Sequence, residues 1–320
     1  MADSAPESRA HHFVPKCWLA GFTESGQNDG RLWVTDFKRK RNWPSTPAKT
    51  GLRRDFNRID RPNVTDPLIA EKALADIEGI VAPILRALND DVREPTSDER
   101  DHILEFMALQ CIRHPAFRAT IDRSVEAKIE AALVSKERWE RLLRELGVPP
   151  DQPDMSYETA LASLKSRVPF IAGDNLYYLL YGAKFAEPIA ATFRARYWHA
   201  RIDPRGNFIG SDNPVGLDGP GDVSIGFTNA SVVVYPVCRR VLMCGLQHPE
   251  PSKEANRKMV AELNTFAMLG AEEQVYSHRE DFEFLDERRT QQRDWTLFNR
   301  EKIISWSRGQ SRMAQAGLES

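Results

Sequence analysis

Apolar side chains recur every three to four positions between residues 67 and 196, the spacing that places them on one face of an α-helix. The first stripe follows Asp66-Pro67, a carboxylate suited to cap a helix and a proline suited to its first turn. Its members are Leu68, Ile69, Ile77, Ile80, Val81, Ile84, Leu85 and Leu88. We expect one long helix, kinked at Pro83, that packs this whole stripe against a helix carrying Ile103 and Phe106.

Other helix boundaries carry their own signals. The run Thr96-Ser97-Asp98-Glu99 has the form of a capping box and predicts the start of a second helix. A third helix is predicted from about 116 to 146, because Gly147 and two prolines follow it. Shorter helices are predicted over about 157–166, 176–196 and 253–269.

Strand patterns lie on both sides of this helical middle. Residues 31–37 follow an Asn28-Asp29-Gly30 turn signal and are rich in β-branched and aromatic side chains. Residues 198–202 and 207–210 are predicted to form a hairpin around a tight turn. Further strands are predicted at 231–237, 240–246 and 274–277.

These elements predict an α+β fold. A helical middle of about residues 67–196 would combine with a mainly antiparallel sheet from the N-terminal strand and the C-terminal third. We expect a single domain over 1–310, with sheet-rich parts at 30–66 and 197–290, and a flexible tail at 311–320.

The distribution of charge along the chain suggests a binding function for one short segment only. The chain has 44 Lys and Arg against 46 Asp and Glu, a formal charge of -2, which excludes an overall basic field for nucleic acid or membranes. Positive charge concentrates at Lys38, Arg39, Lys40 and Arg41, followed by Lys49. This segment is either a solvated loop or a contact for nucleic-acid phosphates.

The remaining composition narrows the class of protein. The four cysteines stand singly, without the spacing of a structural zinc site. No apolar run approaches the ~18 residues of a membrane span, so we expect no membrane partner. A reducing cytoplasm is the expected location.

Two adjacent histidines, His11 and His12, are the strongest chemical lead. A positioned pair of imidazoles can hold a metal, relay a proton or bind a phosphate oxygen, because their pKa lies near neutrality. The other histidines, among them His102, His199, His248 and His278, are scattered and suggest no role.

The run His11-His12-Phe13-Val14-Pro15 through Leu19 and Phe22, with Gly30-Arg31-Leu32-Trp33-Val34, resembles the start of a widespread bacterial family known only as a domain of unknown function. Members of that family open with His-His-x-Val/Ile-Pro. Further matching runs are Asp76-Ile77-Glu78, Gln110-Cys111-Ile112-Arg113-His114-Pro115, Ser211-Asp212-Asn213-Pro214-Val215, Tyr235-Pro236-Val237 and Asn264. The resemblance implies a shared fold and a shared polar set rather than a reaction. The chain departs from it at Asn57, where an aromatic is commoner, and at Cys238-Arg239, where Ser-Pro is commoner.

The same opening also looks like the first half of a ββα-metal nuclease signature. The second half, an Asn and a metal-binding His within a few tens of residues, is missing, since the next histidine is His102 in a predicted helix.

Seven polar residues form the candidate site: His11, His12, Glu78, Gln110, Arg113, Asp212 and Asn213. They come from a terminus, two helices and a loop, as the parts of an active site commonly do. One histidine would act as base or metal ligand, Asp212 and Glu78 would bind metal or orient an imidazole, and Arg113 would clamp a phosphate or a carboxylate. The candidate ligands of a divalent metal are His11, His12 and Asp212. Each also has a structural interpretation, such as a turn at Asp212, a helix-end cation at Arg113 or an ion pair at Glu78.

Two functions remain open on the sequence. One is a metal-dependent phosphodiester hydrolase, nuclease-like, in which Lys38 to Arg41 and Lys49 meet nucleic acid. The other is a non-catalytic interaction or regulatory protein, whose partner surface is the charged third helix, and in which the same polar set is a structural lock. The two differ in a visible way: the polar set should line an accessible cleft in an enzyme and be buried and mutually bonded in a lock.

Overall fold

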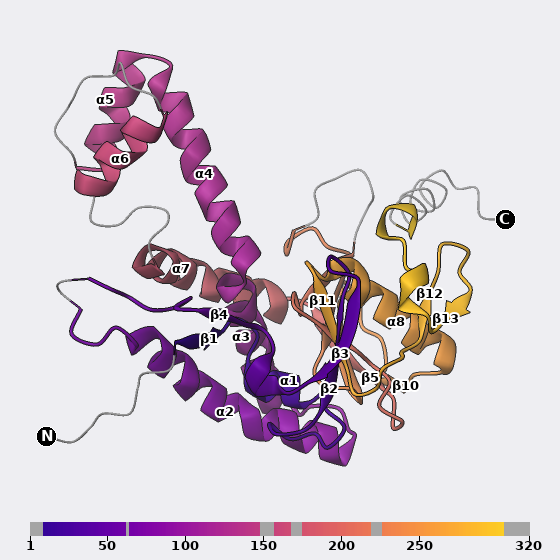
Figure 1. Ribbon diagram of the computed structural model, residues 1–320. Helices are drawn as coiled ribbons and strands as arrows, with labels where there is room; N and C mark the ends of the chain where they lie inside the picture. The colour runs from indigo at the N-terminus through magenta and orange to yellow at the C-terminus, as the bar shows by residue number, and fades with distance from the viewer. Residues whose placement is uncertain (1–8, 62–63, 148–156, 168–174, 219–225, 304–320) are drawn as a thin grey trace, which may run out of the picture. The chain divides into compact units, whose positions relative to one another are not determined.

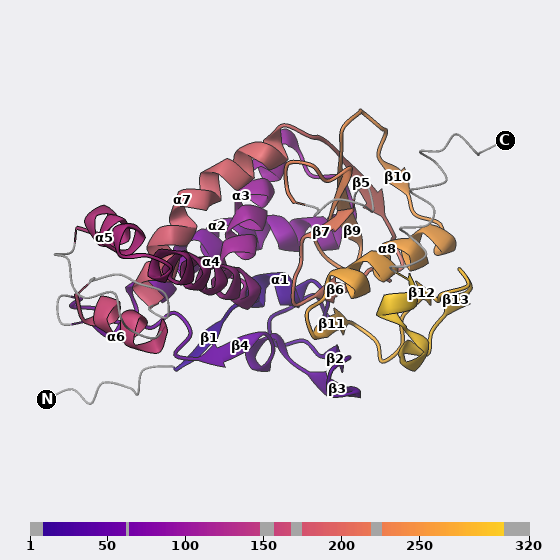
Figure 2. The same cartoon turned by 90° about the horizontal axis from the view of Figure 1, so that it is seen from above.

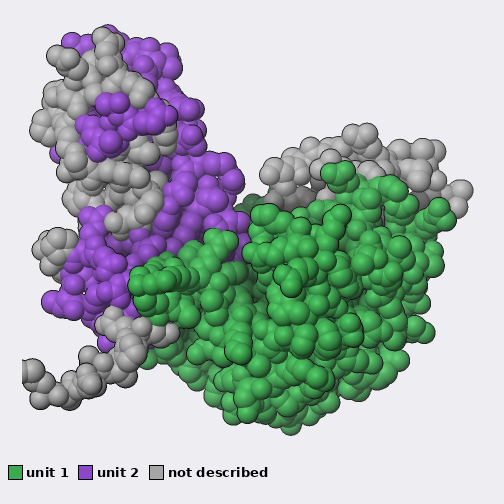
Figure 3. Space-filling view, in the orientation of Figure 1, with its two compact units in different colours: residues 1–56, 73–111, 186–320 green, residues 57–72, 112–185 purple. Residues whose placement is uncertain are grey.

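A computed structural model describes residues 9–61, 64–147, 157–167, 175–218 and 226–303. The described chain divides into two compact units (Figure 3). Unit 1 comprises residues 1–56, 73–111 and 186–320, and unit 2 comprises 57–72 and 112–185. The predicted tail at 311–320 lies outside the described residues.

The fold is α+β, as the sequence predicts, with helices in the middle of the chain and strands towards both ends (Figure 1). The helices are α1 (Lys16–Ala20), α2 (Ile69–Asp91), α3 (Ser97–Arg113), α4 (Pro115–Leu133), α5 (Lys136–Glu145), α6 (Tyr157–Arg167), α7 (Asn175–Arg194) and α8 (Arg257–Gly270), with short 3-10 turns η1 (Pro47–Lys49) and η2 (Trp295–Leu297). No helix in the described ranges is both long enough and apolar enough to cross a membrane.

Two larger sheets organise unit 1. The first has the order β3-β2-β11-β6 and joins β2 (Leu32–Asp36) and β3 (Arg41–Ser45) to β6 (Gly210–Ser211) and β11 (Gln274–Ser277). The second has the order β10-β5-β9-β8-β7, formed by β5 (Tyr197–Ile202), β7 (Gly216–Asp218), β8 (Val232–Pro236), β9 (Val241–Leu246) and β10 (Lys253–Glu254). All pairings are antiparallel except that of β10 with β5.

Two small sheets complete the unit. β1 (Ala10–His12) pairs with β4 (Leu52–Arg54), and β12 (Phe284–Leu285) pairs with β13 (Gln291–Gln292), both antiparallel. Figure 2 shows β1 and β4 side by side beneath α1. The first of these two sheets holds the histidine pair and therefore positions one part of the candidate site.

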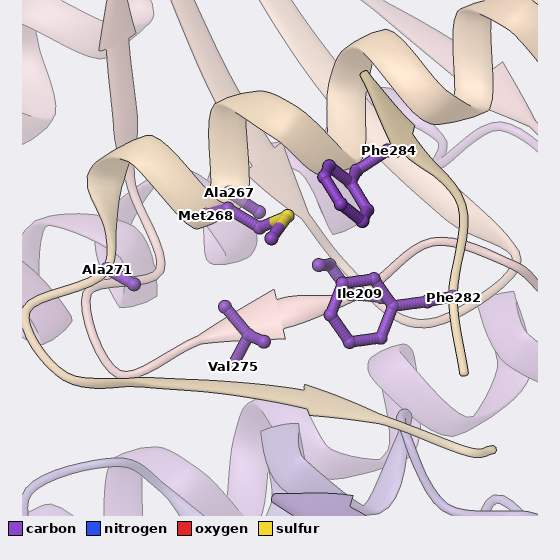
Figure 4. Packing of buried hydrophobic residues seen from close by; sticks show 7 residues of the cluster. All are labelled: Ile209, Ala267, Met268, Ala271, Val275, Phe282 and Phe284. Atoms are coloured by element: carbon purple, nitrogen blue, oxygen red, sulfur yellow. The ribbon is translucent and has the colours of Figure 1, made fainter. Parts of the chain in front are cut away.

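Helix α8 lies against both larger sheets. On one side it meets a cluster of Ile209, Ala267, Met268, Ala271, Val275, Phe282 and Phe284, in which Val275 and Met268 point towards one another (Figure 4). On the other it packs through Val260 against a cluster that includes Val234, Leu242 and Cys244 of the five-stranded sheet. The apolar residues of α8 thus lie on two faces of the helix, one towards each of the larger sheets.

The N-terminal segment enters the core through Trp18. Its ring is fully buried, its Nε1 donates to the carbonyl of Pro236 at 2.8 Å, and its centroid lies 4.6 Å from that of Phe22. Gly210 is needed beside it, because a Cβ there would lie 2.5 Å from Cη2 of Trp18. This contact brings α1, β6 and β8 together.

Unit 2 has a core of its own. The helices α5 and α6 pack on α4 through Ile129, Ala132, Trp139, Leu143, Ala160 and Leu164 (Figure 1). Elsewhere in the unit Arg118 donates to Oδ1 of Asn57 at 2.7 Å and to Oδ1 of Asn175 at 2.9 Å, and it lies 5.1 Å from the centre of the Tyr178 ring. Asn57, which stands where the resembled family more commonly has an aromatic residue, thus binds the buried side chain of Arg118.

Most predicted elements are confirmed, including the capping box. The amide of Thr96 donates to Glu99 at 2.8 Å, and the amide of Glu99 donates to Oγ1 of Thr96 at 3.3 Å. The predicted third helix is wrong as a single element, because the chain breaks between α4 and α5. Ser135 adopts an extended conformation there and caps α5 by accepting the amide of Arg138.

The predicted hairpin of residues 198–202 with 207–210 is also wrong. β5 pairs with β9 and β10, and β6 pairs with β11 in the other sheet. The carboxylate of Asp203 accepts the amides of Arg205 and Asn207, so the turn forms. The chain then leaves the sheet, because the amide of Ile209 donates to the side chain of Asn264 on α8.

Helix α2 buries only part of its predicted stripe. Leu74, Val81, Leu85 and Leu88 are buried, whereas the side of the helix that carries Ile69, Ile77 and Ile80 is exposed. Ile80 is 57% exposed and its neighbour Val81 only 2%, so the expectation that Ile80 is a core residue is wrong. Adjacent residues on a helix lie about 100° apart, and the buried face follows 74, 81, 85 and 88.

We therefore expect Val81→Asp to lower the free energy of unfolding by several kcal/mol, because it buries an unpaired charge. The matched change Ile80→Asp should stay within about 0.5 kcal/mol of the wild type, as surface substitutions do. Urea unfolding measures both. A large loss at Ile80 would mean that this face is covered.

Candidate functional site

The two histidines lie on opposite sides of β1, as neighbours on a strand must. His11 is buried, and its Cα is opposite that of Arg53 on β4. His12 is half-buried, and its Nε2 donates to the carbonyl of Pro47 at 3.2 Å. A carbonyl only accepts, so the proton of His12 is on Nε2 and this ring ties β1 to η1.

His11 lies near the carboxylate of Asp55. Arg9 holds the pKa of Asp55 below its ordinary value, with smaller contributions from Arg54 and from His11. The guanidinium of Arg53 lies 5.5 Å from the centre of the Phe13 ring and 6.0 Å from that of Phe56. The surroundings of His11 thus combine arginines, one carboxylate and two aromatic rings.

Glu78 and Gln110 are each hydrogen-bonded to a residue that the sequence did not single out as a site residue, Cys17 and Tyr235. Sγ of Cys17 donates to Oε2 of Glu78 at 4.0 Å, and Nε2 of Gln110 donates to the hydroxyl of Tyr235 at 3.1 Å. Burial raises the pKa of Tyr235 well above its ordinary value, and Cys17 and Cys111 add to the rise. Tyr235 is therefore a neutral, buried hydrogen-bonding group.

Asp212 lies at the start of β11. Its carboxylate accepts the backbone amides of Glu272, Glu273 and Gln274, at 2.8, 2.8 and 3.0 Å. Its own amide donates to the carbonyl of Gln274 at 3.0 Å. The side chain is only 5% exposed, and none of its partners is His11 or His12.

Asn213 continues the same contact. Its Nδ2 donates to the carbonyl of Gly270 at 3.1 Å, at the end of α8. The Ser-Asp-Asn-Pro run thus fastens the segment after β6 to the loop between α8 and β11. The carboxylate of Asp212 therefore does not form the local turn that the sequence offers as its structural interpretation, because its partners are backbone amides 60 to 62 residues away.

Arg113 is buried in the last turn of α3 and falls in unit 2. The next residue, His114, caps α4 by accepting the amide of Ala116 at 3.1 Å on Nδ1. In the described parts of the chain no three His, Cys, Asp or Glu side chains are grouped so that they could hold a metal ion. The metal set of His11, His12 and Asp212 stays a prediction.

The basic segment is exposed, but half of it is paired. Lys38 binds Glu273 at 2.9 Å and Arg39 binds Asp36 at 3.1 Å. Lys40, with a φ of 51°, and Arg41 lie at the tip of the β2–β3 hairpin. Lys40, Arg41 and Lys49 have no ion pair among the described residues, so they are the cations that a ligand can reach.

His199, which the sequence left without a role, is the most perturbed histidine of the five-stranded sheet. It is 3% exposed, its Cα is opposite that of Cys244, and neither ring nitrogen has a hydrogen-bond partner within the described chain. Burial, reinforced by the nearby cation of Arg201, lowers the pKa of His199 to about 4. The ring is therefore neutral in the folded protein near neutral pH.

Asp212 should prove essential to stability. Asp212→Ala leaves three amides without their acceptor, at about 1–3 kcal/mol each where they stay buried, so we expect a loss of at least about 3 kcal/mol. Asp212→Asn keeps one acceptor oxygen and should lose less. Exposed Asp281, paired with Arg293 at 3.0 Å, is the control, and Asp281→Ala should cost at most about 1 kcal/mol. Equal losses in the free energy of unfolding at Asp212 and Asp281, measured by urea unfolding, would contradict a stabilising role for the Asp212 carboxylate.

His199 predicts a pH dependence of stability. Between its ordinary pKa of 6.5 and the folded value of about 4, the unfolded chain binds a proton that the folded chain does not. The contribution of His199 to the free energy of unfolding should therefore fall as pH falls from about 6.5 to about 4. Half-buried His278, whose pKa is also lowered to about 4, adds to this fall, whereas burial raises the pKa of Asp212 to about 6 and gives a contribution of the opposite sign. Unfolding midpoints measured across this range should depend less steeply on pH in His199→Gln. The exposed control His248→Gln should keep the wild-type slope, and an unchanged slope in His199→Gln would refute the assignment.

The family comparison agrees with the resemblance seen in the first residues. No curated protein and no solved structure matches the chain. A family model matches residues 10–281, which include the histidine pair, Gln110, Asp212 and both larger sheets. The chain belongs to the family described as "Protein of unknown function (DUF4238)".

Proposed function

We propose that this protein is a non-catalytic interaction protein, in which the candidate polar residues lock chain segments together. The observation that carries the proposal is the carboxylate of Asp212, which is buried and spends its oxygens on three backbone amides. A metal ligand or a general base needs a lone pair directed at the ligand or substrate. Backbone amides occupy three of the roughly four acceptor positions of the Asp212 carboxylate, and the residue is only 5% exposed.

The other polar residues support the same interpretation. The side chain of His12 ties β1 to η1, that of Gln110 ties α3 to β8, and that of Asn213 ties the loop after β6 to α8. Each bond joins segments that are distant in sequence and adds to other hydrogen bonds in the same regions, such as that from the amide of Asp212 to the carbonyl of Gln274. Buried polar contacts of this kind fix which segments meet, since wrong pairings leave them unsatisfied.

The partner that we propose is a nucleic acid, held by the hairpin cations Lys40 and Arg41 together with Lys49. These three side chains are exposed and carry no ion pair in the described ranges. Such cations bind the phosphates of nucleic acid, a contact that does not depend on the base sequence. The negative net charge means that binding would be local and weak at physiological salt.

A nuclease screen tests the first part of this proposal. Wild-type protein with Mg²⁺ or Mn²⁺ should leave single- and double-stranded DNA and RNA intact, and His11→Ala and His12→Ala should change thermal stability alone. Cleavage by the wild type that is lost in His11→Ala while the protein stays folded would support the phosphodiester hydrolase instead.

Salt dependence tests the nucleic-acid partner. With three phosphate contacts, the logarithm of the binding constant for duplex DNA should fall with the logarithm of salt with a slope of about -3. The triple change Lys40→Gln, Arg41→Gln, Lys49→Gln should bring the slope close to zero. The matched triple Lys128→Gln, Lys136→Gln, Arg141→Gln removes the same charge from exposed positions of α4 and α5 and should keep it. The opposite result would assign the partner surface to these helices.

A further inference from the structure

Three arginines of unit 1 lie together without a carboxylate. Arg239 and Arg240 are in the turn between β8 and β9, and Arg279 follows β11. No ion pair joins any of the three to an Asp or Glu of the described chain. Other arginines of the protein, such as Arg93 with Glu99 and Arg201 with Glu250, do have such partners.

The charges nearest to Arg239 have its own sign. Burial lowers the pKa of Arg239, and the cations of Arg240 and Arg279 lower it further. Burial also lowers the pKa of the neighbouring His278 to about 4, and Arg279, Arg239 and Arg240 contribute to that shift. A cluster of like charges that is partly removed from water is costly unless an anion joins it.

Neutral groups hold these side chains in place. Nη1 of Arg240 donates to the carbonyl of Asn89 at 3.1 Å, Nε of Arg279 donates to Nε2 of His278 at 2.9 Å, and Nη2 of Arg279 donates to Oδ1 of Asn207. Arg239 lies over Gly206, where a Cβ would be 3.1 Å from its Nη1. The Nε atoms of Arg239 and Arg240 are buried, with no hydrogen-bond partner within the described ranges.

The nearby carboxylates are already engaged. Glu24, which raises the pKa of His278, binds Arg31 at 2.6 Å, and Asp203 binds Arg205 at 3.2 Å. The three guanidinium groups are therefore not paired with a carboxylate of the described chain, and hydrogen bonds to neutral groups hold Arg240 and Arg279.

We propose that the cluster of Arg239, Arg240, Arg279 and His278 binds a phosphate group. A guanidinium fork matches phosphate oxygens, and a phosphate monoester with about two negative charges, or successive phosphodiesters with one each, balances three arginines better than a carboxylate with one. Because Nε2 of His278 accepts from Arg279, the proton of this ring is on Nδ1 and is a further donor. The phosphate belongs either to a small phosphorylated molecule or to a nucleic-acid backbone, and the proposal does not depend on the hairpin cations.

Titration calorimetry with inorganic pyrophosphate tests the site on the full chain. Wild-type protein should bind pyrophosphate, and Arg239→Gln and Arg279→Gln should each weaken binding at least tenfold. The control Arg205→Gln removes a neighbouring arginine that has a carboxylate partner, and it should change binding less than twofold. Binding to the wild type that is no tighter than to Arg239→Gln would overturn the proposal.

Thermal melting without ligand separates a ligand site from a structural one. Removing a cation from a repulsive cluster should leave the melting temperature unchanged or raise it, and exposed Arg279 is the safer position to vary. A melting temperature that falls in both variants, with pyrophosphate binding retained, would make the cluster structural and the proposal wrong.

A 20-nucleotide single-stranded DNA without a terminal phosphate identifies the source of the phosphate. Loss of DNA binding in Arg239→Gln would indicate a backbone phosphate, whereas loss of pyrophosphate binding alone would indicate a small molecule. The hairpin triple variant should still bind pyrophosphate. If the hairpin cations do not bind duplex DNA, the proposed function fails. Pyrophosphate binding still tests the arginine cluster independently.

Discussion

The contact between Asp212 and the backbone at the start of β11 is the constraint on which the rest of unit 1 depends. It fixes where α8 ends and where β11 begins. β11 then pairs with β2 on one side and β6 on the other, so the four-stranded sheet takes its register from this point. Asn213 secures the other end of the same loop, and α8 is thereby placed between the two larger sheets.

Local signals were enough to predict the long helices and the strands β2, β5, β6, β8, β9 and β11, because capping, turn chemistry and apolar period act within a few residues. The capping box at Thr96 and the strand at 274–277 are examples. Local signals did not predict α1 or the strands β1, β3, β4, β7, β10, β12 and β13. What local signals could not supply was partner choice. The alternating pattern of 198–202 is equally compatible with the strand that follows it and with β9, and a distant side chain, Asn264, decides between them.

The candidate site shows the same division. Of the seven residues that the sequence identified, His11, Gln110, Arg113 and Asp212 are buried, whereas His12, Glu78 and Asn213 are half-buried. The sequence could not show that Asp212 faces backbone amides, since three amides of an ordinary loop leave no mark in the sequence. Cys17 and Tyr235 were also missed as members, although both lie inside runs that carry the family resemblance. The net charge of -2 likewise gives no indication that Arg239, Arg240 and Arg279 lie together in the fold.

The pairing of β2 with β11 has a consequence for synthesis of the chain. Trp33 is opposite Ser277, so about 240 residues separate the two strands in sequence. At about 5–20 residues per second, the β2–β3 hairpin would wait on the order of 10–50 s on the ribosome with one edge unpaired. An open strand edge is a template for aggregation, and the charged tip of this hairpin, rich in Lys and Arg, is the kind of feature that discourages it. The cations at residues 38–41 would then lower the risk of aggregation while the chain is still being made.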